Sequence, residues 1–255
     1  MNTRNLLILM AFGGVVALAA CSTAEADKFG SSDSFCDAKA DAECMNLAAK
    51  CGATTDACKT LRVSACKTAA ATASGGGRSY VANAAQACID SINDTYKNGA
   101  ASVSPDAEVA TTKVCDRVFR GSKAERDPCG STGECSGSLI CDTVCATEET
   151  VSLNGGCGNA GQVCGTGTYC QDQGGKKFCL SKEADGAICA ADKPCIETDR
   201  CVNHCVPRAT SGQACNTDDD CASVAPYCDT TSSPKKCRPK YESTSGACKD
   251  FGSGG

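Results

Sequence analysis

The sequence has no tryptophan, and aromatic residues make up only 4% of its 255 residues. Between Cys129 and Cys237 the only aromatic residues are Tyr169, Phe178 and Tyr227. A segment this poor in large apolar side chains cannot fold by hydrophobic burial alone, so covalent cross-links must stabilise it. This scarcity excludes an ordinary apolar core for the second half of the chain.

Histidine is scarce too, since His204 is the single one. Serine and cysteine hydrolases normally take their general base from histidine. No Cys-x-x-Cys pair occurs, which excludes the simplest thioredoxin-like and zinc-knuckle motifs. His204 lies in the stretch CVNHC, but the matching stretch CDTVC at Cys141 to Cys145 has no histidine, so a structural role is favoured over metal binding. We predict no catalytic residue, no metal site and no cofactor.

Positive charge is not in excess, because 25 Lys and Arg residues face 30 Asp and Glu residues and give a formal charge of -5. No basic patch stands out, so the sequence predicts no nucleic-acid partner. Asp218-Asp219-Asp220 is an acidic cluster held between cysteines. Three consecutive carboxylates do not converge on one calcium ion without a special turn, so we expect a solvated turn there.

The N-terminus carries an export signal. Arg4 is followed by an apolar stretch from Leu6 to Val16 and then by small residues. This stretch is shorter than the roughly 20 apolar residues that a bilayer span needs, so a cleaved signal is the better interpretation.

The stretch Leu18-Ala19-Ala20-Cys21 resembles the lipobox of bacterial lipoproteins. The resemblance implies a signal peptide over residues 1–20 and acyl chains on Cys21, which would anchor the protein to a membrane. Residues 21–32 are small and polar and suit a flexible tether. Ser22, at the next position, favours the outer membrane by the same resemblance. The alternative is an ordinary signal peptide that is cut near a cysteine.

Cysteine is abundant, with 25 residues in the chain. If Cys21 carries lipid, an even number remains, and in an exported protein dense cysteine indicates a disulfide framework. Binding of metal by thiolates is the alternative, and it needs a reducing compartment.

From residue 33 to 121 the cysteines recur at helical spacing, and Cys36, Cys44 and Cys51 share one helix face. The stretch Gly52-Ala53-Thr54-Thr55 indicates a helix stop followed by an N-cap. In an antiparallel hairpin turning there, Cys51 would oppose Cys58 and Cys44 would oppose Cys66. The sequence therefore predicts the disulfides Cys51–Cys58 and Cys44–Cys66.

A second helix pair is predicted after the glycines at 75–77. One helix should run from about Ser79 to Asn98, and the next should begin at Ser104-Pro105-Asp106 and end at Gly121. Cys88 and Cys115 lie about equally far from the turn, so they should form a disulfide. We therefore predict a disulfide-stapled domain of four helices over 33–121.

Residues 122–240 contain four blocks of four cysteines, at 129–145, 157–179, 189–205 and 215–237. The first and third blocks have five, five and three residues between cysteines; the second has six, five and eight, and the fourth has five, six and eight. The larger unit is thus a pair of blocks that repeats after about 60 residues. Tyr169 and Tyr227 precede matching cysteines, and a glycine precedes the first cysteine of the later three blocks (Gly156, Gly186, Gly212).

The pattern G-x-x-C-x5-C-x5-Y-C-x8-C at Gly212 to Cys237 resembles the cysteine-rich modules of Dickkopf N-terminal regions and EB-type repeats. The whole layout resembles bacterial cysteine-rich lipoproteins with a helical cysteine domain and Dickkopf-like repeats. This resemblance implies a surface-anchored array of short hairpins and loops, usually without assigned activity. The chain departs from Dickkopf proteins in using separate four-cysteine blocks, so their receptor-binding role is not carried over.

If the four blocks close internally and the helices form three disulfides, Cys36 and Cys248 remain. Either they pair with each other and clasp the two ends of the mature chain, or one of them bridges to a second molecule. Residues 241–255 are predicted to form a C-terminal tail.

The expected fold class is therefore α plus small disulfide-rich. The expected function is that of a non-enzymatic, lipid-anchored protein of the cell envelope with a structural or interaction role, whose partner is an extracellular or periplasmic protein or glycan. Two alternatives stay open. One is a protease inhibitor that presents the loop 216–220 or 171–178, and the other is a redox or metal-binding protein with a reactive thiol.

Overall fold

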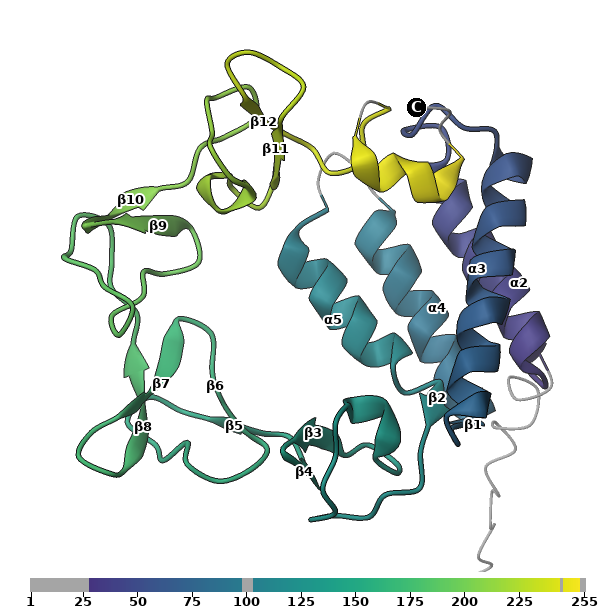
Figure 1. Ribbon diagram of the computed structural model, residues 1–255, viewed down its shortest axis with the longest axis horizontal. Coiled ribbons are helices and arrows are strands. Elements are labelled where there is room, and N and C mark those ends of the chain that lie inside the picture. The colour runs from purple at the N-terminus through teal and green to yellow at the C-terminus, as the bar shows by residue number, and fades with distance from the viewer. Residues whose placement is uncertain (1–27, 98–102, 244, 253–255) are drawn as a thin grey trace, which may run out of the picture.

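The computed structural model describes residues 28–97, 103–243 and 245–252 (Figure 1). It consists of helices and small two-stranded sheets cross-linked by 12 disulfides, as expected for a disulfide-rich chain. Cys21 and the rest of the lipobox lie outside the described residues. None of the helices in the described ranges is long and apolar enough to cross a membrane.

Four helices occupy the first half of the described chain. They are α2 (Ser32–Leu47), α3 (Thr55–Gly75), α4 (Ala82–Tyr96) and α5 (Pro105–Cys115). The side chains of Ser31, Thr54 and Ser104 cap α2, α3 and α5 by accepting hydrogen bonds from backbone amides in the first turn, which satisfies donors that the helix leaves free.

Two helix boundaries differ from the prediction. Instead of extending α4, Ser79–Tyr80 forms strand β1, which pairs with β2 (Phe119–Arg120). That pairing also ends α5 at Cys115, before the predicted Gly121. The reason is aromatic packing, because Phe35, Tyr80 and Phe119 lie within 5.6–6.3 Å of one another, measured between ring centroids.

The second half holds four modules, which we number 1 (129–145), 2 (157–179), 3 (189–205) and 4 (215–237). Each contains one antiparallel hairpin, and β5 and β6 form a parallel pair that leads into module 2. Modules 1 and 4 also contain the short 3-10 helices η2 (Thr132–Glu134) and η3 (Asp218–Asp220). The strands are β3 (Ile140–Asp142), β4 (Val144–Ala146), β5 (Glu149–Val151), β6 (Gln162–Cys164), β7 (Thr168–Asp172), β8 (Lys177–Ser181), β9 (Asp199–Val202), β10 (His204–Pro207), β11 (Tyr227–Asp229) and β12 (Lys236–Arg238).

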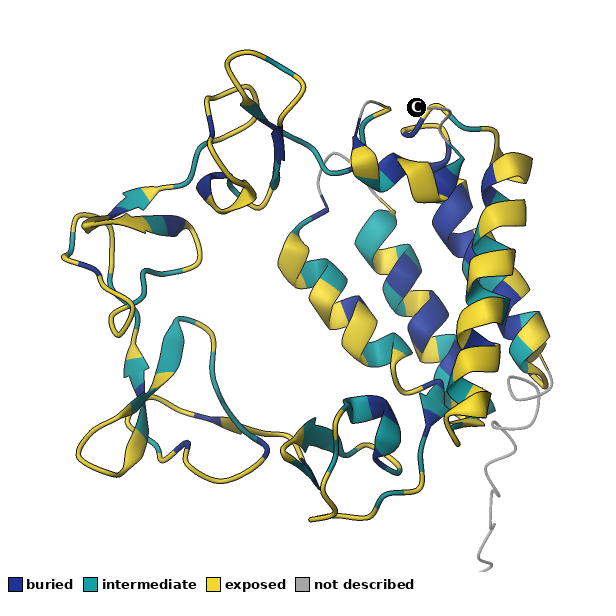
Figure 2. Ribbon diagram, viewed as in Figure 1, coloured by how far each residue is buried: buried dark blue, intermediate teal, exposed yellow. Residues whose placement is uncertain are grey.

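The apolar core lies among the helices, whereas most residues of the modules are exposed or half-buried (Figure 2). One cluster lies near β1 and β2 and includes Phe29, Phe35 and Ile92. A second lies at the end of α2 and includes Leu47, Tyr241 and Phe251. Because Tyr241 and Phe251 follow the modules in the chain, the second cluster is built from both ends of the described chain.

The segment predicted as a C-terminal tail is therefore part of the core. It forms the 3-10 helix η4 (Gly246–Phe251), and Cys248 bonds to Cys51 across a sequence separation of 197 residues. The modules form an arc that leaves the helices after β2 and returns to them at η4 (Figure 1). The reason is apolar burial, since Tyr241 and Phe251 are only 6% and 5% exposed.

The disulfides of the first helix pair differ from the predicted ones. The structure contains Cys36–Cys66 and Cys44–Cys58, so the predicted Cys44–Cys66, Cys51–Cys58 and Cys36–Cys248 are wrong. Both bonded pairs are centred on residue 51, because α2 ends at Leu47 and the connection starts earlier than the glycine at 52 suggests. The predicted Cys88–Cys115 disulfide of the second pair is confirmed.

Candidate binding surface on the disulfide-stapled modules

All four modules share one disulfide connectivity. In each, the first cysteine bonds to the third and the second bonds to the fourth, so the blocks close internally. The bonds are Cys129–Cys141, Cys135–Cys145, Cys157–Cys170, Cys164–Cys179, Cys189–Cys201, Cys195–Cys205, Cys215–Cys228 and Cys221–Cys237. The two bonds of a module run from the two strands of its hairpin to the segment that precedes the hairpin, so both strands are fixed to that segment.

The hairpin of each module carries its third and fourth cysteines directly opposite each other. In module 2, for example, Cys170 is the register partner of Cys179 across β7 and β8. The same register holds for the hairpins of modules 1, 3 and 4. The sulfurs of opposed cysteines bond to different partners, so one small sheet anchors both disulfides.

A left-handed residue recurs three positions before the first cysteine of each module. These residues are Arg126, Asn154, Gly186 and Gly212, with φ angles of 73°, 65°, 78° and 82°. The backbone amide of each donates a hydrogen bond of 2.7 or 2.8 Å to the carbonyl oxygen of the module's fourth cysteine. Glycine adopts this conformation without strain, whereas other residues pay about 1–2 kcal/mol. Gly156, which the sequence pattern grouped with the later glycines, is not the equivalent residue; Asn154 is.

Module 1 is tied to the helical half by a buried arginine. Arg120, which is 5% exposed, donates hydrogen bonds to the backbone carbonyls of Thr132 (2.7 Å) and Leu139. Arg78 adds a hydrogen bond of 3.1 Å to the Ser131 hydroxyl. These hydrogen bonds join Arg78 and β2 to module 1.

Neighbouring modules are joined in the same polar way. Between modules 2 and 3, the Tyr169 hydroxyl donates a hydrogen bond of 2.9 Å to the carbonyl of Asp192, and Lys182 pairs with Glu197 at 2.7 Å. Between modules 3 and 4, Arg200 pairs with Asp220. Polar contacts thus occur at these two junctions, between modules 2 and 3 and between modules 3 and 4.

No family model, curated protein or solved structure matches this chain. Its function therefore has to be argued from its own residues.

The acidic cluster at 218–220 was predicted as a solvated turn, and this holds for the exposed Asp218 and Asp219 but not for the buried Asp220. The cluster forms η3, and Asp220 is 9% exposed and accepts hydrogen bonds from the backbone amides of Asn216 (2.7 Å) and Thr217 (3.3 Å). Asp218 accepts one from the amide of Cys228 at 2.7 Å. Although burial raises the pKa of Asp220, the backbone hydrogen bonds, first that of Asn216, outweigh it and lower the pKa below its usual value. The cluster therefore organises module 4.

His204 lies exposed on β10, opposite Val202, and is not a member of any group of potential metal ligands found among the described residues. Among the residues that the structure describes, the groups of side chains close enough to share a metal ion are triplets of cysteine sulfurs, one triplet in each module. All of these sulfurs are in disulfides. A disulfide sulfur is not a thiolate, so these triplets offer no ordinary metal ligands.

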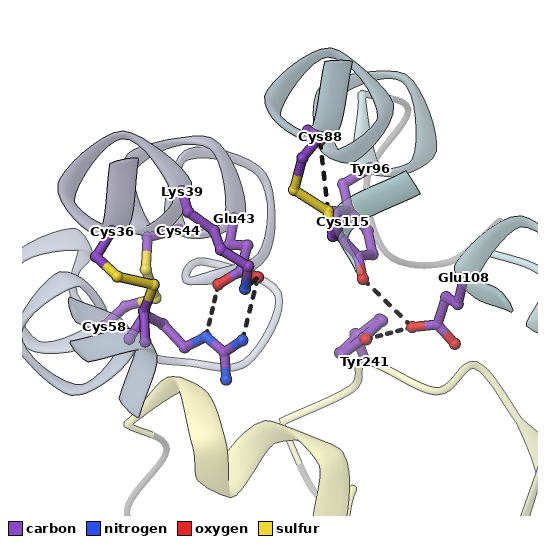
Figure 3. A network of polar contacts seen from close by, with 12 residues as sticks. Cys36, Lys39, Glu43, Cys44, Cys58, Cys88, Tyr96, Glu108, Cys115 and Tyr241 are labelled. Carbon is purple, nitrogen blue, oxygen red and sulfur yellow. Dashed lines mark hydrogen bonds and ion pairs between the residues drawn. A yellow bond between two sulfur atoms is a disulfide. The ribbon is translucent and has the colours of Figure 1, made fainter. Parts of the chain in front are cut away.

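The sequence reasoning missed a polar network among the helices (Figure 3). Glu43, only 6% exposed, accepts two hydrogen bonds from Arg62 (2.6 and 3.1 Å) and one from Lys39 (2.6 Å). Burial raises the pKa of Glu43, but the hydrogen bonds and charges of Arg62 and Lys39 together lower it below 4.5. The i, i+4 spacing of Lys39 and Glu43 would have allowed their ion pair to be predicted from the sequence, but not the pairing of Glu43 with Arg62.

A second part of this network links the C-terminal segment to the helices. Glu108 on α5 accepts hydrogen bonds from Lys240 (2.6 Å) and from the hydroxyl of Tyr241. The Tyr96 hydroxyl donates a longer hydrogen bond of 3.5 Å to Glu108. Burial raises the pKa of Tyr96 to about 12, so its hydroxyl remains protonated and able to donate.

Proposed function

We propose that this protein is a non-enzymatic, lipid-anchored envelope protein that presents its modules to a protein or glycan partner. In this proposal Cys21 carries the lipid, and a four-helix domain supports two tandem pairs of four-cysteine repeats. The tether is shorter than the predicted 21–32 and ends at Lys28, because Phe29 is buried and Ser31 caps α2. The resemblance of the lipobox and of the repeat pattern to bacterial cysteine-rich lipoproteins supports this assignment and a location at the outer membrane.

The observation that carries the proposal is a constant frame with variable loops. The disulfide connectivity, the hairpin register and the left-handed residue are the same in all modules, whereas the loops between cysteines differ in length and sequence. The hairpin of module 2 turns at Gly174 and Gly175, whereas that of module 3 turns at Asn203. A rigid frame lowers the conformational entropy lost when a loop binds, which favours recognition over catalysis.

The tether limits where the modules can act. The eight residues from 21 to 28 span at most about 29 Å when fully extended, so the helical domain would stay close to the membrane. A partner on the same envelope surface is thus within reach.

Lipid attachment is tested by replacing Cys21→Ser in a bacterial host fed with an alkyne-bearing fatty acid. Incorporation of the label should be lost in C21S, and the protein should move from the membrane fraction to the soluble fraction. Ser22→Ala is the matched control and should keep the label. Labelling that persists in C21S would exclude this lipid site.

Recognition of a partner by the modules is tested by using the full C21S chain as bait on intact envelopes. A partner should be captured by the oxidised chain and lost when the chain is reduced and alkylated, because the hairpins then unfold. Charge-swapped variants at each hairpin tip should locate the module that binds. Equal capture by the alkylated chain would contradict recognition by a folded loop.

Protease inhibition is the second candidate, and one loop favours it. The tip of the β7–β8 hairpin exposes Lys176 and Lys177 between the stapled Cys170 and Cys179. A basic side chain on a constrained loop suits the acidic specificity pocket of trypsin-like proteases. By contrast, the loop 216–220 is held by its own hydrogen bonds. Stoichiometric inhibition of trypsin, lost in the K176Q/K177Q variant, would establish this function instead.

A further inference from the structure

Modules 1 and 3 are equivalent units of the repeat, and each has a cavity at the same place beside its hairpin. The four cysteines of module 3 lie 60 positions after those of module 1. The cavity of module 1 is lined by residues 139–141, and that of module 3 by the equivalent residues 199–201. The volumes are about 210 Å³ in module 1 and about 480 Å³ in module 3. The two cavities can therefore be compared position by position.

The cavity of module 1 is occupied by an arginine of the same chain. Arg120 lines this cavity, and its guanidinium donates hydrogen bonds to the backbone carbonyls of Thr132 (2.7 Å) and Leu139. The backbone amide of Cys141 donates a hydrogen bond of 3.1 Å to the Thr132 hydroxyl. The carbonyl of Leu139 and the amide of Cys141 thus find partners outside the β3–β4 hairpin.

The hairpin of module 3 turns the same two backbone groups outward. The amide and carbonyl of Cys205 bond to Ala187 and Gly186, so Cys205 does not bond to the opposite Cys201. In an antiparallel pair such positions alternate with bonded ones, and the amide of Arg208 does bond to the carbonyl of Thr198. The amide of Cys201 and the carbonyl of Asp199 therefore point away from β10.

Module 3 lacks the side chains that serve these groups in module 1. The position of Arg120 is taken by Leu180, which has no side-chain donor, and that of Thr132 by the exposed Asp192. The carbonyl of Asp192 accepts from the Tyr169 hydroxyl of module 2. Among the described residues no side chain donates to the carbonyl of Asp199, so this acceptor is open toward the cavity.

Asp199 adds a second acceptor that module 1 does not have. It replaces Leu139, lines the cavity and is 5% exposed. Its Oδ1 accepts a hydrogen bond of 3.1 Å from the Thr198 hydroxyl, whereas its Oδ2 is buried and has no partner among the described residues. A buried carboxylate oxygen without a donor costs free energy, which a bound donor would recover.

The charges around the cavity favour a cation. The lining contains three acidic and two basic side chains, which are Asp199, Asp219, Asp220, Arg200 and Arg208. Arg200 pairs with Asp220, and Arg208 donates to two backbone carbonyls. Because Arg200 follows Asp199 in β9, the two side chains point to opposite faces of the strand. The lining thus has a formal charge of -1, and its buried carboxylate is the one without a donor on Oδ2.

We propose that the cavity of module 3 binds an arginine side chain of a partner protein, as the cavity of module 1 binds Arg120. The guanidinium donates to Oδ2 and to the backbone carbonyl of Asp199. A planar guanidinium bonds two acceptors at once, which the ammonium of lysine does less well. In Figure 1, β9 and β10 lie on the side of the arc away from the helices, so an outside chain can reach them. This inference rests on the proposed display function and specifies a protein as the partner.

The test is an NMR titration of N-acetyl-arginine amide into the ¹⁵N-labelled, oxidised, full C21S chain. The backbone amides of residues 199–201 should shift, and those of modules 1 and 2 should not. The citrulline analogue is the matched ligand, because it has the same shape without the charge. It should bind at least about tenfold more weakly.

Two aspartates of module 3 give a matched pair of variants. Asp199→Asn should weaken binding of the arginine amide at least about tenfold, whereas Asp192→Asn, which removes the same charge outside the cavity, should leave it unchanged. The proposal is overturned if residues 199–201 do not shift, if the two variants bind alike, or if citrulline binds as tightly as arginine. The citrulline comparison needs no variant, so it decides the matter even if D199N does not fold.

Capture from intact envelopes separates this proposal from the display function. Loss of capture in D199N but not in D192N supports both. Binding of the arginine amide without capture of any partner supports the cavity and contradicts display at the envelope. Equal capture by D199N and the parent chain contradicts the arginine site and leaves display by another loop standing.

Discussion

The helical half and the modules are both rich in disulfides, but they use them differently. Among the helices, disulfides reinforce a core that already contains Phe29, Leu47 and Ile92. In module 4 the buried cluster consists of four cysteines and Ala225. The cystines are thus an addition to the core in one half and are themselves the core in the other.

This contrast separates two ways in which a disulfide stabilises a fold. By restricting the unfolded chain, a bond that closes a longer loop stabilises more. By filling the interior, a bond stabilises more where few other apolar side chains are available to bury. The helices and modules of this chain allow the two contributions to be compared within one molecule.

The largest effect is expected from removing one disulfide in a module. Cys157→Ala/Cys170→Ala should unfold module 2 and remove the hydrogen-exchange protection of β7 and β8, because little besides Val151 and its cystines is buried there. The matched variant Cys88→Ala/Cys115→Ala should leave α4 and α5 protected. Loop entropy alone predicts the opposite order. It assigns a stabilisation of about 3 kcal/mol to the Cys157–Cys170 bond, with its separation of 13 residues, and about 3.5 kcal/mol to the Cys88–Cys115 bond, with its separation of 27. Greater damage in the helical variant would therefore show that loop entropy dominates.

Removing the Cys51–Cys248 bond should have the next largest effect. Its sequence separation of 197 residues sets an upper limit of about 5 kcal/mol in the loop-entropy model, and other disulfides shorten the effective loop. In Cys51→Ala/Cys248→Ala the protection of η4 should fall while the modules keep theirs. The urea midpoint of the helical half should decrease. An unchanged midpoint would show that Tyr241 and Phe251 hold the segment without the bond.

Glu43 makes the helical half acid-sensitive. Because its pKa is below 4.5 in the folded state, the carboxylate contributes stability above that pH, and this contribution is lost as the pH falls through the folded-state pKa. Glu43→Gln should cost about 3 kcal/mol at pH 7, since it leaves Arg62 without its buried anion. The difference from the parent protein should shrink as the pH falls below 4.5. Urea unfolding at a series of pH values measures this, and a difference independent of pH would contradict it.

The smallest effect is expected from substitutions at the left-handed residue that precedes each module. Gly186→Ala should destabilise module 3 by about 1–2 kcal/mol, because a left-handed backbone is unfavourable for alanine. No atom outside the local chain lies within 4 Å of the added Cβ, so the cost comes from the backbone. Arg126→Gly should stabilise module 1 by up to about 1 kcal/mol for the same reason. Local hydrogen exchange of each hairpin measures both, and the same sign for both variants would refute the equivalence of these positions.

The sequence allowed prediction wherever a signal was local. Ser104 and Pro105 correctly marked the start of α5, and the distances of Cys88 and Cys115 from their turn gave the right disulfide. Internal closure of the four-cysteine blocks was also correct, although spacing alone did not give the connectivity within them.

Prediction failed where long-range packing decided the outcome. The turn between α2 and α3 was placed too late by about four residues, which shifted every pairing of that hairpin. Nothing in the local pattern around Tyr241 and Phe251 indicates that they return to α2, because that contact joins segments nearly 200 residues apart. The ion pair of Glu43 and Arg62 was missed for the same reason, since the two side chains meet only when α2 and α3 are paired.

The Cys51–Cys248 bond also changes how the arc would respond to mechanical force. Tension applied to any module reaches the helices by two covalent routes, one through β2 and one through η4. A single backbone cut between two modules removes one route and leaves the other intact, so the chain opens from a ring into two arms that both remain attached to the helices. A partner pulling on these loops therefore works against a double tether, and two cuts are needed to release a module.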